Sequence, residues 1–389
     1  MIPSFLKKSS TVAVAAGLLL SSAPGFAAQP SKENIPLEGV SEFPLIFFAV
    51  YDNDDSFASI KRLGGTHVHN YKMGKSIGES QEFFDRAARF GLKVMANLDG
   101  KRRLETGESP DALKEYVNHF KNHEAMGFWY LYDEPANKVD PKELLPYYKM
   151  LKTETPGIPV ANGHEWAKGW WSFRGVQDIL MNDTYPVTGA PFPEAKLDHQ
   201  SKFTKAAIGP KNHVIPIIQI MNWRAMAERG ASQIRGYDLR ELRYPNAAEM
   251  RYMCFSSVAL GAKGLAFYSY DRSRRLGSAW MEETLPPLLQ EIKEFAKAVG
   301  YPAVNKVELD SADENVIAGL WKHGGCAWLV VANARPEATV ISYPLHSALP
   351  KGELAAWGNT RKIEASLKGG ILTAELQPWE IAIWEVKEN

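Results

Sequence analysis

Between residues 43 and 300 the chain alternates eight times between a short apolar run and an amphipathic segment. The apolar runs predict strands at 43–51, 66–71, 92–98, 127–133, 158–162, 177–182, 214–221 and 264–270. Between these runs, apolar side chains recur at helical spacing, as at Phe57, Ile60 and Leu63. Because a continuous apolar run is typical of a strand buried on both faces, the alternation predicts a parallel sheet with crossover helices.

Two parallel architectures fit this alternation, a closed (β/α)8 barrel and an open doubly wound sheet. The open sheet usually carries a glycine-rich, phosphate-binding turn after its first strand. Here that turn is Asp52-Asn53-Asp54-Asp55, whose acidic side chains would repel a phosphate. Eight units over about 260 residues suit a barrel. We therefore expect an α/β chain with a (β/α)8 TIM barrel over residues 28–300.

From Tyr301 onward the pattern changes to short apolar runs separated by Gly, Pro and Asn. These runs predict further strands at 316–321, 326–332, 339–343, 353–357, 371–376 and 381–386. Short strands with frequent turn residues are typical of antiparallel sheets. We expect residues 301–389 to form a small antiparallel β-sandwich domain.

The first 27 residues have the three-part layout of a secretory signal peptide. Lys7-Lys8 supplies a basic start, residues 11–20 are apolar, and Gly25-Phe26-Ala27 is a plausible cleavage site. The apolar stretch is too short for an ordinary transmembrane helix, and no other stretch predicts a membrane span. The sequence therefore predicts export to the periplasm or the exterior.

Charge and cysteine content argue against several functional classes. The chain has 45 basic and 45 acidic residues and no basic run, which argues against binding to nucleic acid. Cys254 and Cys326 lie in different predicted domains and in apolar surroundings, so we expect free thiols. No metal-ligand spacing is apparent: His67 and His69 alternate on one predicted strand without a third ligand. We expect neither a metal nor another cofactor, and the sequence does not indicate an oligomeric state.

Polar and aromatic residues gather at the predicted carboxyl ends of the strands, where barrels of this type place their active sites. The candidate substrate-binding residues at these ends are His69, Asn97, Asp99, Tyr132, Glu165, Trp166, Tyr185, Gln219, Trp223, Tyr268 and Tyr270. Carboxylates serve acid and base chemistry, amides bind hydroxyl groups, and aromatic rings stack on sugars. The set therefore predicts a carbohydrate substrate.

The motif WYLYDEPA at 129–136 ends the fourth predicted strand with adjacent Asp133 and Glu134. Two carboxyl groups at the end of an apolar, aromatic strand are costly unless they are paired or functional. Aromatic walls would raise the pKa of one of them, as a general acid requires. Asp183, at the end of the sixth strand, is a candidate second carboxylate. The alternative is that Asp-Glu-Pro only forms a helix-capping loop.

These features resemble those of bacterial (β/α)8-barrel glycoside hydrolases. The resemblance rests on the eight alternations, on Asp133-Glu134-Pro135 and on the pattern Arg243-Tyr244-Pro245, Glu249-Met250-Arg251 and LGAKG at 260–264. The ending PWEIAIWE at 378–385 resembles the β-domain that often closes such enzymes. The resemblance implies hydrolysis of the O-glycosidic bonds of a poly- or oligosaccharide without a cofactor.

Three mechanisms remain open, each with Glu134 as general acid/base. In the first, Asp133 orients a 2-acetamido group of the substrate and Tyr185 assists, as in similar substrate-assisted hexosaminidases. In the second, Asp183 or Glu165 is the base of an inverting pair or the nucleophile of a retaining pair. In the third, the nucleophile lies on strand seven. That strand carries Gln219 and Asn222 but no acid before Glu228, which weakens the third mechanism. Between the first two, we favour Glu134 with Asp183 as the essential carboxylates, with the stereochemistry left open.

Two other functions compete with hydrolysis. A non-catalytic sugar-binding barrel would keep the aromatic residues but would not need a carboxyl group with a shifted pKa. A polysaccharide lyase would need a base such as Tyr185 or His69 and a basic pocket for uronate, whereas the predicted pocket is acidic.

Overall fold

The computed structural model describes residues 36–136, 138–165, 170–188, 197–208, 213–227, 238–277, 279–302, 306–307, 309, 313–345, 353–358 and 361–387. The predicted signal peptide, residues 1–27, and the candidate Trp166 lie outside these residues.

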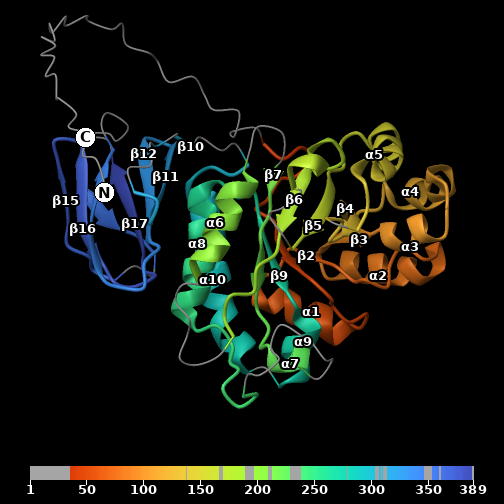
Figure 1. The fold of residues 1–389 in the computed structure, drawn as a ribbon, viewed down its shortest axis with the longest axis horizontal. Helices are drawn as coiled ribbons and strands as arrows, with labels where there is room; N and C mark the ends of the chain where they lie inside the picture. Colours follow the sequence, from red (N-terminus) through yellow and green to blue (C-terminus); the bar gives the residue numbers. More distant parts are fainter. Residues whose placement is uncertain are drawn as a thin grey trace, which may run out of the picture. The chain divides into compact units, whose positions relative to one another are not determined.

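A nine-stranded parallel sheet forms the first part of the chain (Figure 1), in the order β7-β6-β5-β4-β3-β2-β1-β9-β8. Its strands are β1 (Leu45–Phe47), β2 (His67–Val68), β3 (Lys93–Asn97), β4 (Met126–Asp133), β5 (Val160–His164), β6 (Ile179–Asn182), β7 (His213–Val214), β8 (Ile217–Gln219) and β9 (Leu265–Tyr268). The two edge strands, β7 and β8, are consecutive in sequence and are separated only by Ile215 and Pro216. Pro216 has no N–H for the ladder, so the two are halves of one interrupted strand.

A bridge between Asp183 and Ile217 links the end of β6 to β8 and closes the sheet. The eight strand positions of the closed sheet confirm the predicted (β/α)8 barrel. The interruption at Pro216 was not predicted, because the residues on both sides of it are apolar.

Helices follow the strands along the chain. They are α1 (Asp54–Leu63), α2 (Ile77–Arg89), α3 (Gly100–Glu105), η2 (Pro110–Leu113), α4 (Lys114–Phe120), α5 (Pro141–Glu154), η3 (Trp170–Gly175), α6 (Leu197–Ala207), α7 (Arg224–Ala227), α8 (Ala247–Leu260), α9 (Tyr270–Arg275) and α10 (Ala279–Ala298). Helix α8 shows why the ends fall where they do. Asn246 and Glu249 form a capping box at its start, and Gly261 ends it in the left-handed conformation at φ 108°.

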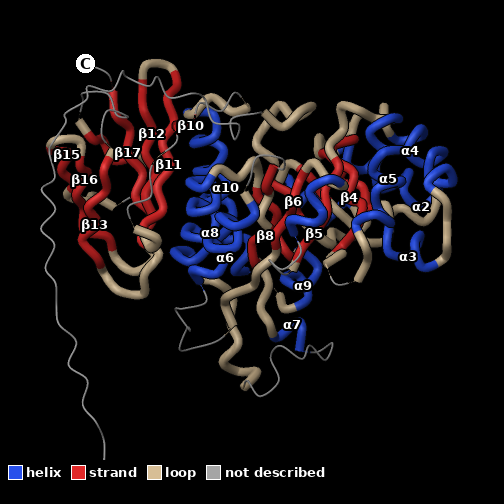
Figure 2. The backbone as a smooth tube through the Cα atoms, turned by 45° about the horizontal axis from the view of Figure 1, so that its top comes forward, coloured by secondary structure: helices blue, strands red, loops and turns tan. Residues whose placement is uncertain are grey.

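Side chains of the barrel strands, whose backbone is drawn in red in Figure 2, alternate between two apolar clusters. Ile46 on β1 and Phe128 on β4 belong to the cluster inside the barrel. Phe47 and Trp129, their neighbours in sequence, belong to the larger cluster between strands and helices. Strands with both faces covered need apolar residues at every position, which explains the continuous runs in the sequence.

After α10 the strands are antiparallel. One sheet has the order β10-β11-β12-β17-β14 and the other β13-β16-β15. Their strands are β10 (Lys306–Val307), β11 (Val316–His323), β12 (Cys326–Asn333), β13 (Thr339–Pro344), β14 (Leu354–Ala356), β15 (Ala365–Lys368), β16 (Ile371–Leu376) and β17 (Ile381–Lys387). Leu329, Trp384 and Leu372 from the two sheets share one buried cluster, as in a sandwich. The predicted antiparallel fold is confirmed, whereas the boundary at 300/301 stays a prediction.

Cys254 is buried and Cys326 is half-buried, and no disulfide joins them. Among the described residues, no helix combines the length and the apolar character that crossing a bilayer requires.

Candidate active site at the carboxyl ends of the strands

A pocket of about 280 Å³ opens at the carboxyl ends of β4, β5, β6 and β9. Its lining residues are Tyr71, Asp133, Glu134, Glu165, Asp183, Thr184, Tyr185, Phe203, Ile217, Trp223, Met226 and Tyr268. Four of them are carboxylic acids, and they come from the ends of three neighbouring strands. The pocket therefore combines the acidic and aromatic residues that the sequence places at the strand ends.

Asp133 faces the pocket because β4 contains a β-bulge. Tyr130 pairs with Ala161 and Tyr132 with Asn162, so Leu131 is an extra residue in the ladder. The side chain of Asn162 accepts a hydrogen bond from the Tyr132 N–H at 3.0 Å and satisfies the interrupted backbone. One extra residue shifts the alternation of the side chains. Tyr130 and Asp133, three positions apart, consequently interact on the same side of the strand.

The Asp133 carboxylate is held and tuned by its surroundings. The Tyr130 hydroxyl donates a hydrogen bond to Asp133 Oδ1 at 2.5 Å. The side chain is exposed to the pocket, but the surrounding protein displaces part of its water. This desolvation raises the pKa of Asp133 to about 6. The Tyr130 hydrogen bond opposes this rise, and the negative charge of Glu134 adds to it. Asp133 therefore changes protonation state close to neutral pH.

Glu134 has the left-handed backbone conformation, φ 56°, which is unfavourable for a residue with a Cβ. Its N–H donates to the Gly163 carbonyl at 2.9 Å and holds this conformation. Its carboxylate forms an ion pair with Lys138 at 2.5 Å, and both side chains are half-exposed. Strained residues cluster at functional sites, where the surrounding structure enforces the strain.

Asp183 follows β6 and lines the pocket with the other three acids. Burial raises its pKa well above the usual value, and the negative charges of Glu134 and Asp133 raise it further. The Tyr185 hydroxyl donates to Asp183 Oδ2 at 3.2 Å, while Oδ1 is buried with no partner among the described residues. A raised pKa is the property that a proton donor needs, so Asp183 is a candidate general acid.

Aromatic side chains form one wall of the pocket. The Tyr185 and Tyr268 rings are stacked, with centroids 5.0 Å apart and planes 17° apart. Trp223 Nε1 donates to the Tyr185 carbonyl at 3.2 Å and fixes the edge of this wall. The Arg272 guanidinium lies over the Tyr268 ring, 4.7 Å from its centroid. Flat rings of this kind can pack against the C–H face of a sugar.

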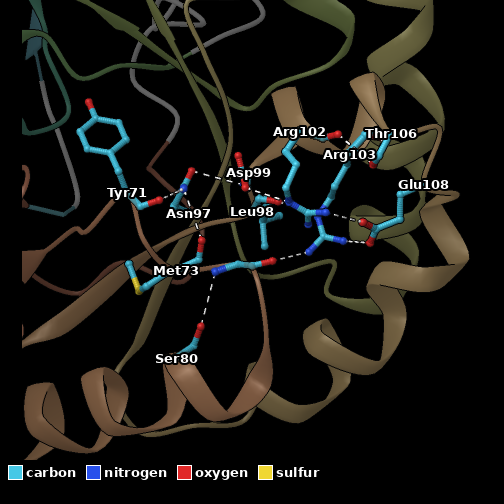
Figure 3. A network of polar contacts seen from close by, with 11 residues as sticks. Tyr71, Met73, Ser80, Asn97, Leu98, Asp99, Arg102, Arg103, Thr106 and Glu108 are labelled. Carbon is cyan, nitrogen blue, oxygen red and sulfur yellow. Dashed lines mark hydrogen bonds and ion pairs between the residues drawn. The ribbon is translucent and has the colours of Figure 1, made fainter.

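Asn97 and Asp99 do not line the pocket but support its rim (Figure 3). The Asn97 amide donates to the carbonyl of Tyr71, a pocket residue, at 2.9 Å. Asp99 has the left-handed conformation at φ 52°, and its carboxylate accepts a hydrogen bond from Arg102 at 3.0 Å. Both side chains therefore have partners within the protein, and a role in contacting substrate stays a prediction.

Four other candidates also lie off the pocket surface. His69 is fully buried inside the barrel against the rings of Phe48, Tyr71 and Tyr130. Tyr132 belongs to the apolar layer between strands and helices, and so does the fully buried Tyr270. Gln219 is fully buried, and its amide bonds to the backbone of Val187 and Met221. By contrast, Glu165, Tyr185, Trp223 and Tyr268 line the pocket, and their contact with a substrate stays a prediction.

Tyr71, Tyr130, Lys138 and Gly163 contribute to the site but were not among the candidates. Tyr71 ends the second predicted strand and could have been selected by that position. Tyr130 and Gly163 depend on the β-bulge, which leaves no mark in the pattern of apolar residues. Among the described residues, no group of three or more His, Cys, Asp or Glu side chains is arranged to hold a metal ion.

Comparison with solved structures identifies barrels of known enzymes. An α-amylase from Geobacillus thermoleovorans, solved with acarbose, is 8% identical with a TM-score of 0.58, covering 93% of this chain and 100% of its own. A maltogenic α-amylase from Thermotoga neapolitana is 12% identical with a TM-score of 0.55, covering 89% and 99%. A β-L-arabinopyranosidase from Geobacillus stearothermophilus is 10% identical with a TM-score of 0.55, covering 90% and 98%.

At these identities the likeness concerns the fold, which is one that glycoside hydrolases use. No protein-family model matches the sequence. No curated protein matches it either.

Proposed function

We propose that this protein is a glycoside hydrolase that cleaves the O-glycosidic bonds of a poly- or oligosaccharide. The observation that carries the proposal is the convergence of Asp133, Glu134, Glu165 and Asp183 on one pocket beside a stacked aromatic wall. Glycoside hydrolysis needs two carboxyl groups with different protonation states across the scissile bond. The structural neighbours are barrels of glycoside hydrolases, and this supports the class of reaction but not a particular sugar.

Within this proposal, Asp183 is the general acid and Asp133 is the ionised partner. Asp183 has the raised pKa that a proton donor requires. It donates its proton to the leaving glycosidic oxygen as the bond to the anomeric carbon breaks. With a pKa of about 6, Asp133 is mostly ionised at neutral pH. Its carboxylate supplies an electron pair either to the anomeric carbon or to a water that attacks it.

The sequence favoured Glu134 as the acid, and the two assignments differ in what surrounds the carboxyl group. Glu134 is half-exposed and already engaged by Lys138. Asp183 is surrounded by acids and has an oxygen without a partner among the described residues. These surroundings favour Asp183 as the proton donor and leave Glu134 as a candidate for binding substrate hydroxyl groups.

A lyase reaction is less well supported by the same geometry. Burial and the nearby Asp183 raise the pKa of Tyr185 well above its usual value, which makes it a poor base. His69, the other candidate base, does not reach the pocket. The negative charge of the pocket would also repel a uronate.

The test is hydrolysis of a panel of polysaccharides and aryl glycosides by the wild type and by Asp183→Asn, Asp133→Asn and Glu134→Gln. We expect Asp183→Asn and Asp133→Asn to lose roughly 100- to 10,000-fold in kcat/KM and Glu134→Gln to lose roughly 10-fold. Asp85→Asn, which changes an exposed carboxylate on α2, is the matched control.

Substrates with a good leaving group identify which residue is the general acid. Dinitrophenyl glycosides need little protonation of the leaving oxygen, so Asp183→Asn should retain most of its activity on them. The same rescue in Glu134→Gln, with no rescue in Asp183→Asn, would return the acid role to Glu134. Sugar binding with no turnover of any substrate in the wild type would identify a non-catalytic barrel.

A further inference from the structure

Tyr130 contacts Asp133 from inside the barrel, below the pocket surface. Its ring is fully buried, and its hydroxyl donates to Asp133 Oδ1 at 2.5 Å. The Phe48 ring lies edge-on to it with centroids 5.6 Å apart, and the His69 ring lies edge-on with centroids 5.1 Å apart. The Tyr130 ring therefore has no room to turn away, and its hydroxyl is fixed in one place.

Gly163, on the neighbouring strand β5, leaves the space that this contact needs. A Cβ built at position 163 would overlap the Tyr130 hydroxyl and lie 3.2 Å from Asp133 Oδ1. The backbone of Gly163 does not have the positive φ that favours glycine over other residues. Glycine is therefore required here for space, not for backbone conformation.

We propose that Tyr130 is a positioning residue that holds the Asp133 carboxylate in its reactive orientation, and that glycine at position 163 is a condition for this contact. The proposal rests on the catalytic role of Asp133 proposed above. A hydroxyl that donates to a carboxylate stabilises the ionised form, so the contact favours the state of Asp133 that attacks or activates water.

Asp133 is surrounded by other groups whose charges also act on it. The titratable groups that face it come from the ends of five strands and are Tyr71, Tyr130, Glu134, Lys138, Glu165, Asp183, Tyr185 and Tyr268. Tyr130 and Lys138 lower the pKa of Asp133, and Glu134 and Glu165 raise it. Removing only the Tyr130 hydroxyl leaves the others unchanged.

The first test is the pH dependence of kcat/KM in Tyr130→Phe. We expect the acid limb, which reports ionisation of Asp133, to move upward by about one pH unit, so that activity falls roughly tenfold more at pH 5 than at pH 8. Tyr252→Phe is the matched control, because it removes a buried hydroxyl that is 3.0 Å from Ser201 Oγ on the outer side of the barrel. Its acid limb should coincide with that of the wild type.

A double-mutant cycle tests the role of Gly163. Gly163→Ala should lower activity strongly in the wild type and much less in Tyr130→Phe, because the hydroxyl that clashes with the new methyl group is then absent. A purely structural requirement for Gly163 would give the same loss in both backgrounds. Equal losses would remove Gly163 from the proposal.

A direct titration of Asp133 tests the contact with Tyr130 independently of the proposed reaction. The ¹³C carboxyl resonance of Asp133, assigned with Asp133→Asn, is followed from pH 4 to pH 8 in the wild type and in Tyr130→Phe. An upward shift of the midpoint in a protein that hydrolyses no glycoside would support the positioning contact and reject the reaction. Superimposable titrations would overturn the positioning role even in an active enzyme.

Discussion

Folding raises the pKa of Asp133, and this lowers the stability of the protein at neutral pH. Its pKa of about 6 is above the usual value of 3.8, so between these two pH values the folded state binds more protons than the unfolded state. The contribution of Asp133 to the free energy of unfolding therefore decreases as pH rises from about 4 to 6 and stays reduced at neutral pH. The main cause of the raised pKa is burial of the carboxyl group, and the negative charges of Glu134 and Glu165 add to it.

Asp133→Asn should consequently stabilise the protein at neutral pH. Because the side chain is open to solvent in the pocket, screening limits the gain to about 1 kcal/mol at pH 7.5. The gain should vanish near pH 4, where the aspartate is protonated. Urea denaturation at both pH values measures it, and the asparagine oxygen can still accept the Tyr130 hydrogen bond.

Asp85→Asn is a control of opposite sign. Hydrogen bonding to His123 lowers the pKa of Asp85, so its ionised form favours the folded state. That substitution should not stabilise the protein at pH 7.5. Equal gains in both variants would indicate a general effect of reduced negative charge instead of relief at the pocket.

The sequence could identify which acids meet at the site, but not which of their side chains face the pocket. Asp133, Glu134, Glu165 and Asp183 follow predicted strands, and the closure of the barrel brings such ends together. Whether an end residue faces the pocket depends on the local register. The bulge at Leu131 turns Asp133 inward and leaves Tyr132 in the outer layer, and a regular alternation from Tyr130 would predict the reverse.

At the scale of elements, the loop between β3 and α4 is organised by one buried arginine. Arg103 on α3 donates to the Leu98 carbonyl at 2.7 Å, to the Gly74 carbonyl at 2.5 Å and to the Glu108 carboxylate (Figure 3). Only 3% of its surface is exposed. It joins the turn after β2, which carries Tyr71, to the segment after β3.

Arg103→Met should therefore destabilise the protein by about 3 kcal/mol, because it removes the donor to two carbonyl groups and the more deeply buried of the two arginines that pair with Glu108. Arg102→Met is the matched control. Arg102 is the neighbouring residue and also bonds to Glu108, but its side chain is 36% exposed, and its loss should cost less than about 1 kcal/mol. Thermal denaturation distinguishes the two, and similar losses would contradict the anchoring role.

The elements predicted from sequence were those with long periodic signals. The apolar spacing of Phe57, Ile60 and Leu63 indicated a helix, and these residues lie in α1 (Asp54–Leu63). Helices α3, α7 and α9 were missed because each has six residues or fewer, which is too short for a repeating apolar face. Strand β15 was missed because none of its side chains is fully buried, so it has no apolar run.

At the scale of the whole molecule, three buried histidines control the response to acid. His67 and His69 on and after β2 and His164 on β5 are buried in the barrel. Burial lowers the pKa of His67 and His69 to about 3 and that of His164 to about 4. Each is therefore neutral in the folded protein at pH values where it is protonated in the unfolded chain.

We expect the free energy of unfolding to decrease as pH falls from about 6.5 to 4. In this range each histidine binds its proton only in the unfolded state and costs the fold about 1.4 kcal/mol per pH unit. Asp133 and Asp183, whose pKa values are raised, act in the opposite direction. The histidines prevail because they outnumber these two acids, since burial also lowers the pKa of His213 to about 4, and because solvent screens Asp133. Urea denaturation at pH 7, 6 and 5 measures the slope.

His69→Leu isolates the contribution of one histidine. His69 is the suitable choice because neither ring nitrogen has a hydrogen-bond partner among the described residues, so its removal strands no donor or acceptor. The variant should have a pH slope that is smaller by about 1.4 kcal/mol per unit between pH 6 and 5. His199→Leu, at an exposed position on α6, is the control and should keep the wild-type slope. An unchanged slope in His69→Leu would mean that His69 is protonated inside the barrel, with a counter-charge or a water beside it.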